Sequence, residues 1–222
     1  MVSKFTRLLL ALAAIATANC SFASDATAVW IGVNAPSYKI NDRIKTVTGV
    51  EIRCPDASDL NYYRIGQKFY TKLNSDWTMG SHVSFENTKV LSDWRHTLRL
   101  ELELNPKKIR FGENGPQLSM RNRWELRWKE GKGSEIFHRI RQQSKLAWDL
   151  SKGPFSSYGF GNEVFFEEDK GKITANRFYP VVLTAKHSGE LKGTYYLMYQ
   201  SKRIGTSSNW FGEYVLGTSL SF

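Results

Sequence analysis

The chain has 222 residues, with 31 Lys and Arg against 21 Asp and Glu, which gives a net charge of +10 at pH 7. This length fits one large domain, and no internal stretch has the composition of a linker. No apolar run approaches the roughly 20 residues that a membrane-spanning helix needs, so a helical membrane protein is excluded.

The first residues have the order of a secretory signal peptide: a positively charged start, a short apolar run and then small residues. We therefore expect residues 1–23 to be a signal peptide and residues 24–222 to form the mature domain. Cys20 also follows the apolar run, so lipid attachment at this cysteine is the alternative processing route.

Beyond this segment, apolar and polar side chains alternate with a period of two, which is typical of β-strands whose two faces meet different surroundings. The alternation is clearest in residues 94–104, where Leu98 and Leu100 share one face and Arg99 and Glu101 share the other. Short polar separators predict antiparallel hairpins between neighbouring strands. The expected strands are Thr27–Ala35, Asp59–Leu73, Trp77–Lys89, Trp94–Leu104, Leu118–Trp128, Ile136–Leu150, Ser157–Glu167, Ile173–Ala185, Leu191–Ser201 and Tyr214–Phe222.

Three places depart from this simple pattern. Residues 36–58 are long and polar, and form either an external loop or one more hairpin around Ile44 to Arg53. Residues 105–116, rich in Gly and Pro, fall on what should be the side of the short turns. Pro180 cannot donate a hydrogen bond to a neighbouring strand, so we expect a bulge or a strand end there.

Four features favour a membrane barrel over a soluble barrel or sandwich, in which the apolar face would form the core. The strands reach the roughly 9 to 11 residues that a tilted bilayer strand needs. The signal peptide directs export, and the chain ends on an apolar-facing aromatic residue, Phe222, as chains delivered to the barrel assembly machinery do. Tryptophans near strand ends resemble an interface girdle. These tryptophans are Trp77, Trp94, Trp128, Trp148 and Trp210.

We therefore predict an all-β fold, a transmembrane antiparallel up-and-down β-barrel of about ten strands in a range of eight to twelve, located in the outer membrane. Backbone amides inside a bilayer must all be paired, so the sheet has to close on itself. The expected partners are outer-membrane lipids and lipopolysaccharide, and the assembly machinery through Phe222. Nucleic acid is excluded, because the charges lie on one face of strands rather than in clusters with stacking aromatics.

Motifs in the second half of the chain, Leu98 to Phe222, resemble a known family. They are the segments 120–128 (MRNRWELRW), 137–142 (FHRIRQ) and 162–166 (NEVFF), followed by Asn176-Arg177 and by Gly189-Glu190. They resemble the outer-membrane barrel family catalogued as domain of unknown function 2490. The resemblance implies a barrel in the outer membrane and no particular activity. A looser likeness, in Arg-rich strands alone, is to the narrow porins for acidic oligosaccharides.

The candidate site is a set of inward-facing cations, here called the basic wall. It consists of Arg95, Arg99, Arg121, Arg123, Arg127, Arg139, Arg141 and Lys145. Opposite charges on the same strands are Glu101, Glu103, Glu125 and Asp149, and Glu163 and Glu167 can join them from the next strand. Two functions remain open: a structural Arg–Glu network that fills the lumen, or a narrow pore or binding site for small anionic solutes.

A lipid-modifying enzyme of the deacylase or phospholipase type is the alternative function. It would use His82, Ser84 and Glu86, which share one face of a strand. Residues two apart along a strand lie about 6 to 7 Å apart, too far for direct hydrogen bonding, and this face is the inward one. We therefore expect no catalytic residues. No metal-ligand spacing and no Gly-rich phosphate loop occur, so no metal or cofactor is expected.

Overall fold

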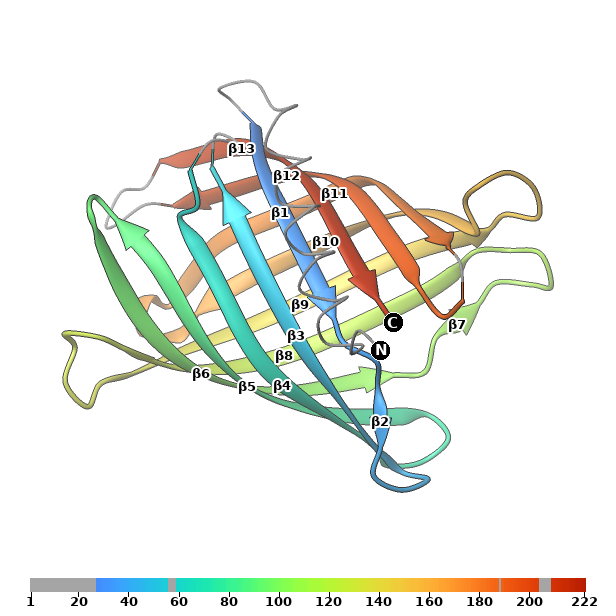
Figure 1. Cartoon of the computed structure of the whole chain (residues 1–222), viewed down its shortest axis with the longest axis horizontal. Coiled ribbons are helices and arrows are strands. Elements are labelled where there is room, and N and C mark those ends of the chain that lie inside the picture. Colours follow the sequence, from blue (N-terminus) through green and yellow to red (C-terminus); the bar gives the residue numbers. More distant parts are fainter. Residues whose placement is uncertain (1–26, 56–58, 188, 204–208) are drawn as a thin grey trace, which may run out of the picture.

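Figure 1 presents the computed structural model of the chain, which describes residues 27–55, 59–187, 189–203 and 209–222. The expected signal peptide and Cys20 lie outside the described residues. Among the described residues, no helix has the length and apolar character required to cross a membrane. The long strands are β1 (Thr27–Asn34), β3 (Ile44–Cys54), β4 (Tyr62–Lys72), β5 (Trp77–Val90), β6 (Asp93–Pro106), β8 (Gln117–Lys129), β9 (Ile136–Asp149), β10 (Ser157–Glu167), β11 (Lys172–Lys186), β12 (Lys192–Arg203) and β13 (Trp210–Ser221).

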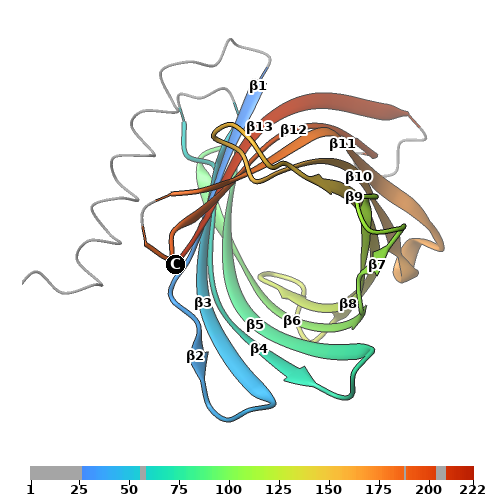
Figure 2. The same cartoon turned by 90° about the vertical axis from the view of Figure 1, so that its right-hand side faces the viewer.

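These eleven strands of the described chain form a closed barrel, which is seen as a ring in Figure 2. Each strand is hydrogen-bonded to two neighbours, and β1 closes the ring by pairing with both β13 and β3. Two short strands, β2 (Tyr38–Lys39) and β7 (Ile109–Arg110), extend the pairing of β3 and β8, and one turn of 3-10 helix (Glu168–Lys170) follows β10. Closure leaves no open sheet edge in the ring.

The ten expected strands all occur, and the additional one is β3. It lies within residues 36–58, where the sequence left room for one more hairpin around Ile44 to Arg53. Its alternation is weak, because its inward face mixes Val47 and Gly49 with Glu51 and Arg53. The strand count is therefore inside the expected range but odd.

An odd count changes how the barrel closes. Consecutive strands run antiparallel, so the first and last strands must run in the same direction, and β1 pairs with β13 in parallel register from Thr27↔Tyr214 to Asn34↔Ser221. This differs from the purely antiparallel arrangement that we expected. At the end of this seam the backbone N–H of Phe222 donates to the carbonyl oxygen of Asn34 at 3.3 Å.

The two ends of the barrel therefore carry different connections. The end where β1 begins, here called the N rim, has the connections 91–92, 130–135 and 168–171. The end where β13 finishes, the C rim, has 35–43 and 107–116 among its connections. The sequence placed the long segment 105–116 on the rim of the short turns. Because β3 adds one crossing of the barrel, this segment instead lies on the same rim as the long connection 35–43.

The expected irregularity at Pro180 is confirmed. The register between β11 and β12 shifts between Phe178 and Val181, and the register between β10 and β11 shifts between Gly159 and Gly161. Proline has no amide hydrogen to donate, so the ladder skips this residue. The strand continues beyond the bulge to Lys186.

Side chains are distributed in the reverse of a soluble domain. On β6, Leu98 and Leu102 point outward and are 47% and 39% exposed, whereas Glu101 between them is completely buried inside. The same alternation holds on most strands, whereas on β1 the outward-facing Val29, Ile31 and Val33 are buried. Other exposed outward-facing apolar residues include Ile65, Phe85, Trp124, Ile140, Phe160 and Leu216. On β5, β6, β8 and β9 the apolar face is thus outside and the charged face is inside, as predicted from the sequence.

Candidate functional site

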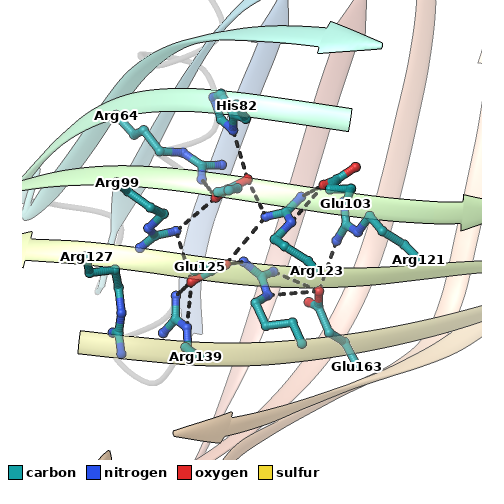
Figure 3. A network of polar contacts seen from close by, with 12 residues as sticks. Arg64, His82, Arg99, Glu103, Arg121, Arg123, Glu125, Arg127, Arg139 and Glu163 are labelled. Atoms are coloured by element: carbon teal, nitrogen blue, oxygen red, sulfur yellow. Dashed lines mark hydrogen bonds and ion pairs between the residues drawn. The ribbon is translucent and has the colours of Figure 1, made fainter. Parts of the chain in front are cut away.

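The lumen contains a network of Arg and Glu side chains whose arrangement follows from strand register (Figure 3). Across β6 and β8, Glu101 lies directly opposite Glu125, and Arg99 lies directly opposite Arg127. Like charges in directly opposite positions repel each other. Partners for these charges lie directly opposite on the other neighbouring strand, as Arg139 does for Glu125, or farther across the sheet, as Arg64 does for Glu101. These contacts join the strands into a single network.

Glu125 is one centre of this network. Its side chain is completely buried and contacts Arg139 at 2.5 Å and Arg141 at 2.6 Å, both from β9. Arg99 and Arg123 approach it at 3.8 and 3.7 Å. A buried carboxylate surrounded by several guanidinium groups is strongly held, because neither charge has water to replace its partner.

Glu101 is a second centre and draws in strands β4 and β5. Its Oε2 lies 2.9 Å from Arg123 and 2.9 Å from Nδ1 of His82, and its Oε1 lies 3.2 Å from Arg64. Arg123 also pairs with Glu103. Four strands are thereby tied together through one carboxylate.

Glu163 on β10 is the third centre. Arg141, Arg121 and Arg177 contact it at 2.7, 2.9 and 3.5 Å. Arg121 and Arg177 come from β8 and β11, so this centre links strands on both sides of β9 and β10. The centres Glu101, Glu125 and Glu163 share Arg123 and Arg141, and the network is continuous.

The structure brings six of the eight basic-wall residues into ion pairs. Arg127 pairs with Glu167 at 3.2 Å, and the other five are those described above. Lys145 instead lies 5.3 Å from the ring centre of Tyr179, with no ion pair among the described residues. Arg95 is exposed near the N rim and contributes no ion pair in the described part of the chain. Asp149 is exposed at the C rim and pairs with Arg110.

Sequence reasoning left five charged residues out of the network, although it named Glu86 as a catalytic candidate. These residues lie on strands β3, β4, β5 and β11, where the alternation of polar and apolar residues is weak or where no strand was expected. The available signal was that each lies an even number of positions from other inward-facing residues of its strand. The five residues are Glu51, Arg53, Arg64, Glu86 and Arg177. These five residues add three cations and two anions, so the inward-facing charges keep a positive surplus, although most of them are paired.

The remaining side of the lumen is aromatic and apolar. A cluster on β1, β11, β12 and β13 fills it, and consists of Ala28, Trp30, Tyr179, Met198 and Val215, with Val182 and Tyr196 packed against it. Trp30 connects this cluster to the charges, because the guanidinium carbons of Arg53 and Arg177 lie 4.0 and 4.6 Å from its ring centre. Cation–π contacts of this kind stabilise a desolvated guanidinium.

Cavities remain at both ends of the lumen. The cavity at the N rim has a volume of about 390 Å³ and is lined by side chains including Trp30, Arg53, Arg99 and Arg127. The cavity at the C rim, of about 360 Å³, is lined by residues of the 35–43 and 73–76 connections and adjoining strands. A smaller cavity of about 90 Å³ lies against Arg64, Lys68 and His82.

The residues proposed for a lipid-modifying enzyme lie inside the lumen. His82 is buried against Glu101, and its ring lies over Gly66, where any added Cβ would overlap it. Glu86 pairs with Arg99 and accepts a hydrogen bond from the hydroxyl of Tyr62 at 2.9 Å. The hydroxyl of Ser84 is buried with no hydrogen-bond partner among the described residues. The structure thus assigns His82 and Glu86 partners other than Ser84.

Among the described residues, no group of three or more His, Cys, Asp or Glu side chains is placed to hold a metal ion. Comparison with known proteins finds the family model described as "Protein of unknown function (DUF2490)", which matches residues 27–210. The match extends over the first half of the chain, beyond the motifs of residues 98–222. No curated protein and no solved structure matches the chain.

Proposed function

This chain belongs to the DUF2490 family of proteins of unknown function, and from that premise we propose that it is an outer-membrane β-barrel whose apolar outer face contacts lipid and whose lumen is closed by the charge network. The reversed distribution of side chains carries this proposal. A soluble barrel would bury its leucines and hydrate its charges, whereas here Leu98 is exposed and Glu101 and Glu125 have no exposed surface. Only a non-aqueous surrounding makes that arrangement favourable.

The placement of tryptophans supports a bilayer. Trp77 and Trp148 lie at strand ends on the C rim, while Trp94, Trp128 and Trp210 lie at strand ends on the N rim. An indole ring is apolar with one polar edge, so it is most stable at the two boundaries between hydrocarbon and water. The five outward-facing rings therefore occupy the positions of two interface girdles.

The lumen geometry favours a closed, structural barrel over an open anion pore. A water-filled channel would expose the side chains that line it, yet Glu101, Glu125 and Glu163 are buried to within 1% of their surface. Their guanidinium partners come from strands on both sides of the network, and Trp30 extends these contacts across the lumen to Arg53 and Arg177. Contacts with lipopolysaccharide and with the assembly machinery through Phe222 belong to the same proposal.

A lipid-modifying enzyme receives less support. Its substrate would approach from the outer face, whereas His82 and Ser84 point into the lumen and are buried. His82 is also fixed by Glu101 and by the close approach of Gly66. A catalytic histidine needs a hydrogen bond to its nucleophile, which these contacts do not provide.

Fluorescence quenching by brominated lipids tests the membrane assignment directly. Two single-tryptophan proteins would be refolded into vesicles, one retaining the outward-facing Trp124 and the other retaining the lumenal Trp30. Lipids brominated in the acyl chain should quench Trp124 strongly and Trp30 weakly. Equal quenching of both, or folding of the protein as a soluble monomer without lipid or detergent, would contradict the proposal.

A further inference from the structure

We propose that the N-rim cavity is a binding site for a small soluble oxyanion, of the phosphate or carboxylate class, centred on Arg99, Arg127 and Lys129. The site rests on the proposed closed lumen, because the network forms its floor. The cavity is of the size that holds small ligands, for which roughly 300 to 1,000 Å³ is usual.

Strand register concentrates positive charge on one wall of this cavity. Arg99 and Arg127 lie directly opposite each other on β6 and β8, and Lys129 follows Arg127 on the same face, opposite Thr97. Directly opposed like charges are unfavourable without an anion between them. Figure 3 shows Arg99 and Arg127 together at one end of the network.

The protein's own carboxylates do not satisfy this wall. Glu86 pairs with Arg99 at 2.5 Å and Glu167 pairs with Arg127 at 3.2 Å, yet the Nε–H groups of both arginines are buried with no hydrogen-bond partner among the described residues. Buried donors of this kind are rare and costly. Two guanidinium donors of this wall therefore have no acceptor among the described residues.

Lys129 adds a charge without a compensating carboxylate. Its ammonium group lies 3.8 Å from the ring centre of Phe137, and no described acidic residue forms an ion pair with it. The two acidic residues that line the cavity are already engaged, Glu86 by Arg99 and Glu213 by Lys202 at 2.8 Å. An oxyanion would complete the donor set, since guanidinium and ammonium groups form their strongest hydrogen bonds with phosphate and carboxylate oxygens.

Calorimetric titration of the folded protein in an uncharged detergent tests this site. Sodium phosphate and sodium succinate are titrated at constant ionic strength, and sodium chloride serves as the reference. We expect saturable binding of at least one of the two oxyanions, weakened roughly tenfold or more by Lys129→Gln or Arg127→Gln, because each removes a charged hydrogen-bond donor. Lys145→Gln is the matched control: it removes one inward lysine outside this cavity and should leave the affinity unchanged.

Several outcomes would overturn the site. One is that phosphate and succinate give the same heat of titration as chloride, in a protein whose folded state is verified by its gel mobility. That result would overturn the site and leave the proposed membrane barrel standing. Failure of the protein to fold in detergent would count against the barrel itself. Another is an equal effect of Lys129→Gln and Lys145→Gln. A short-chain phosphatidic acid tests whether the anion is instead a lipid headgroup. The oxyanion site lies on the lipid-facing surface if this lipid binds, if free phosphate and succinate do not, and if Lys129→Gln leaves the binding of the lipid unchanged.

Discussion

The guanidinium carbon of Arg177 lies 4.6 Å from the ring centre of Trp30, although the two residues belong to β11 and β1, which are not hydrogen-bonded neighbours. Arg53 lies on the same ring at 4.0 Å. Trp30 therefore joins the charge network to the aromatic cluster of the lumen. Tyr179 of the same cluster also contacts the network, because its hydroxyl lies 3.5 Å from Glu163.

Replacement of Trp30 by alanine should destabilise the barrel by about 3–5 kcal/mol, the range for loss of a large buried aromatic side chain. The change would leave a cavity and remove the support of two arginines. Urea unfolding in detergent, followed by circular dichroism, measures this loss. Trp124→Ala, on the outer face, should cost less because detergent or lipid refills the space; an equal or larger loss at Trp124 would contradict the bridging role of Trp30.

Glu125→Gln should be similarly costly, about 3–5 kcal/mol, because it leaves Arg139 as an uncompensated buried cation and removes one of the two carboxylates paired with Arg141. The same unfolding assay measures it. Glu168→Gln, at an exposed carboxylate, should change stability by no more than about 0.5 kcal/mol. Additional removal of one guanidinium in Glu125→Gln/Arg139→Gln should recover part of the loss. If the double variant loses more stability than Glu125→Gln and Arg139→Gln lose in sum, electrostatic compensation is not the cause.

Gly66 should not tolerate a side chain. A Cβ at this position would overlap the imidazole of His82 and displace it from Glu101, so we expect Gly66→Ala to cost about 1–3 kcal/mol through overpacking. Gly32→Ala is the matched control in another lumenal strand, where the nearest atom would be Oγ of Ser219 at 3.5 Å. Unfolding midpoints compare the two variants, and equal stabilities would show that His82 can move freely.

The parallel seam can be tested by cross-linking. A Cβ at Gly32 would lie 3.8 Å from Cβ of Ser219, the usual separation across a disulfide. In a background without other cysteines, Gly32→Cys/Ser219→Cys should oxidise within the folded barrel and migrate as a cross-linked chain on a non-reducing gel. Gly32→Cys/Ser221→Cys, two residues out of register, should not. Cross-linking of the second pair instead of the first would overturn the parallel register.

Conductance across a planar bilayer tests the closed lumen. We expect the wild-type protein to show no steady open channel, because buried ion pairs and Trp30 occupy the lumen between the two end cavities. Insertion is verified independently by resistance of the folded protein to external protease. A steady anion-selective channel would instead favour the pore function that an arginine-lined lumen also permits.

The sequence by itself determined which face of each strongly alternating ribbon is apolar, and strand length, export and tryptophan placement then predicted a barrel with charges inside. The reason is geometric: side chains alternate along a strand with a fixed period of two, so Leu98 and Arg99 must face opposite ways whatever their neighbours. Strand ends were less readable, since the strand predicted from Tyr214 begins at Trp210 and the one predicted from Asp59 begins at Tyr62. The strands with strong alternation, such as 94–104 and 118–128, were located almost to the residue.

The tertiary structure decided what depends on neighbouring strands. Register determines that Glu101 lies opposite Glu125 and must recruit Arg64 and Arg123, and no one-dimensional pattern contains that information. The strand β3 was uncertain because its inward face changes from Val47 to Glu51 as it passes from one part of the lumen to another. That one additional strand made the count odd, and parity alone then required β1 and β13 to close the barrel in parallel.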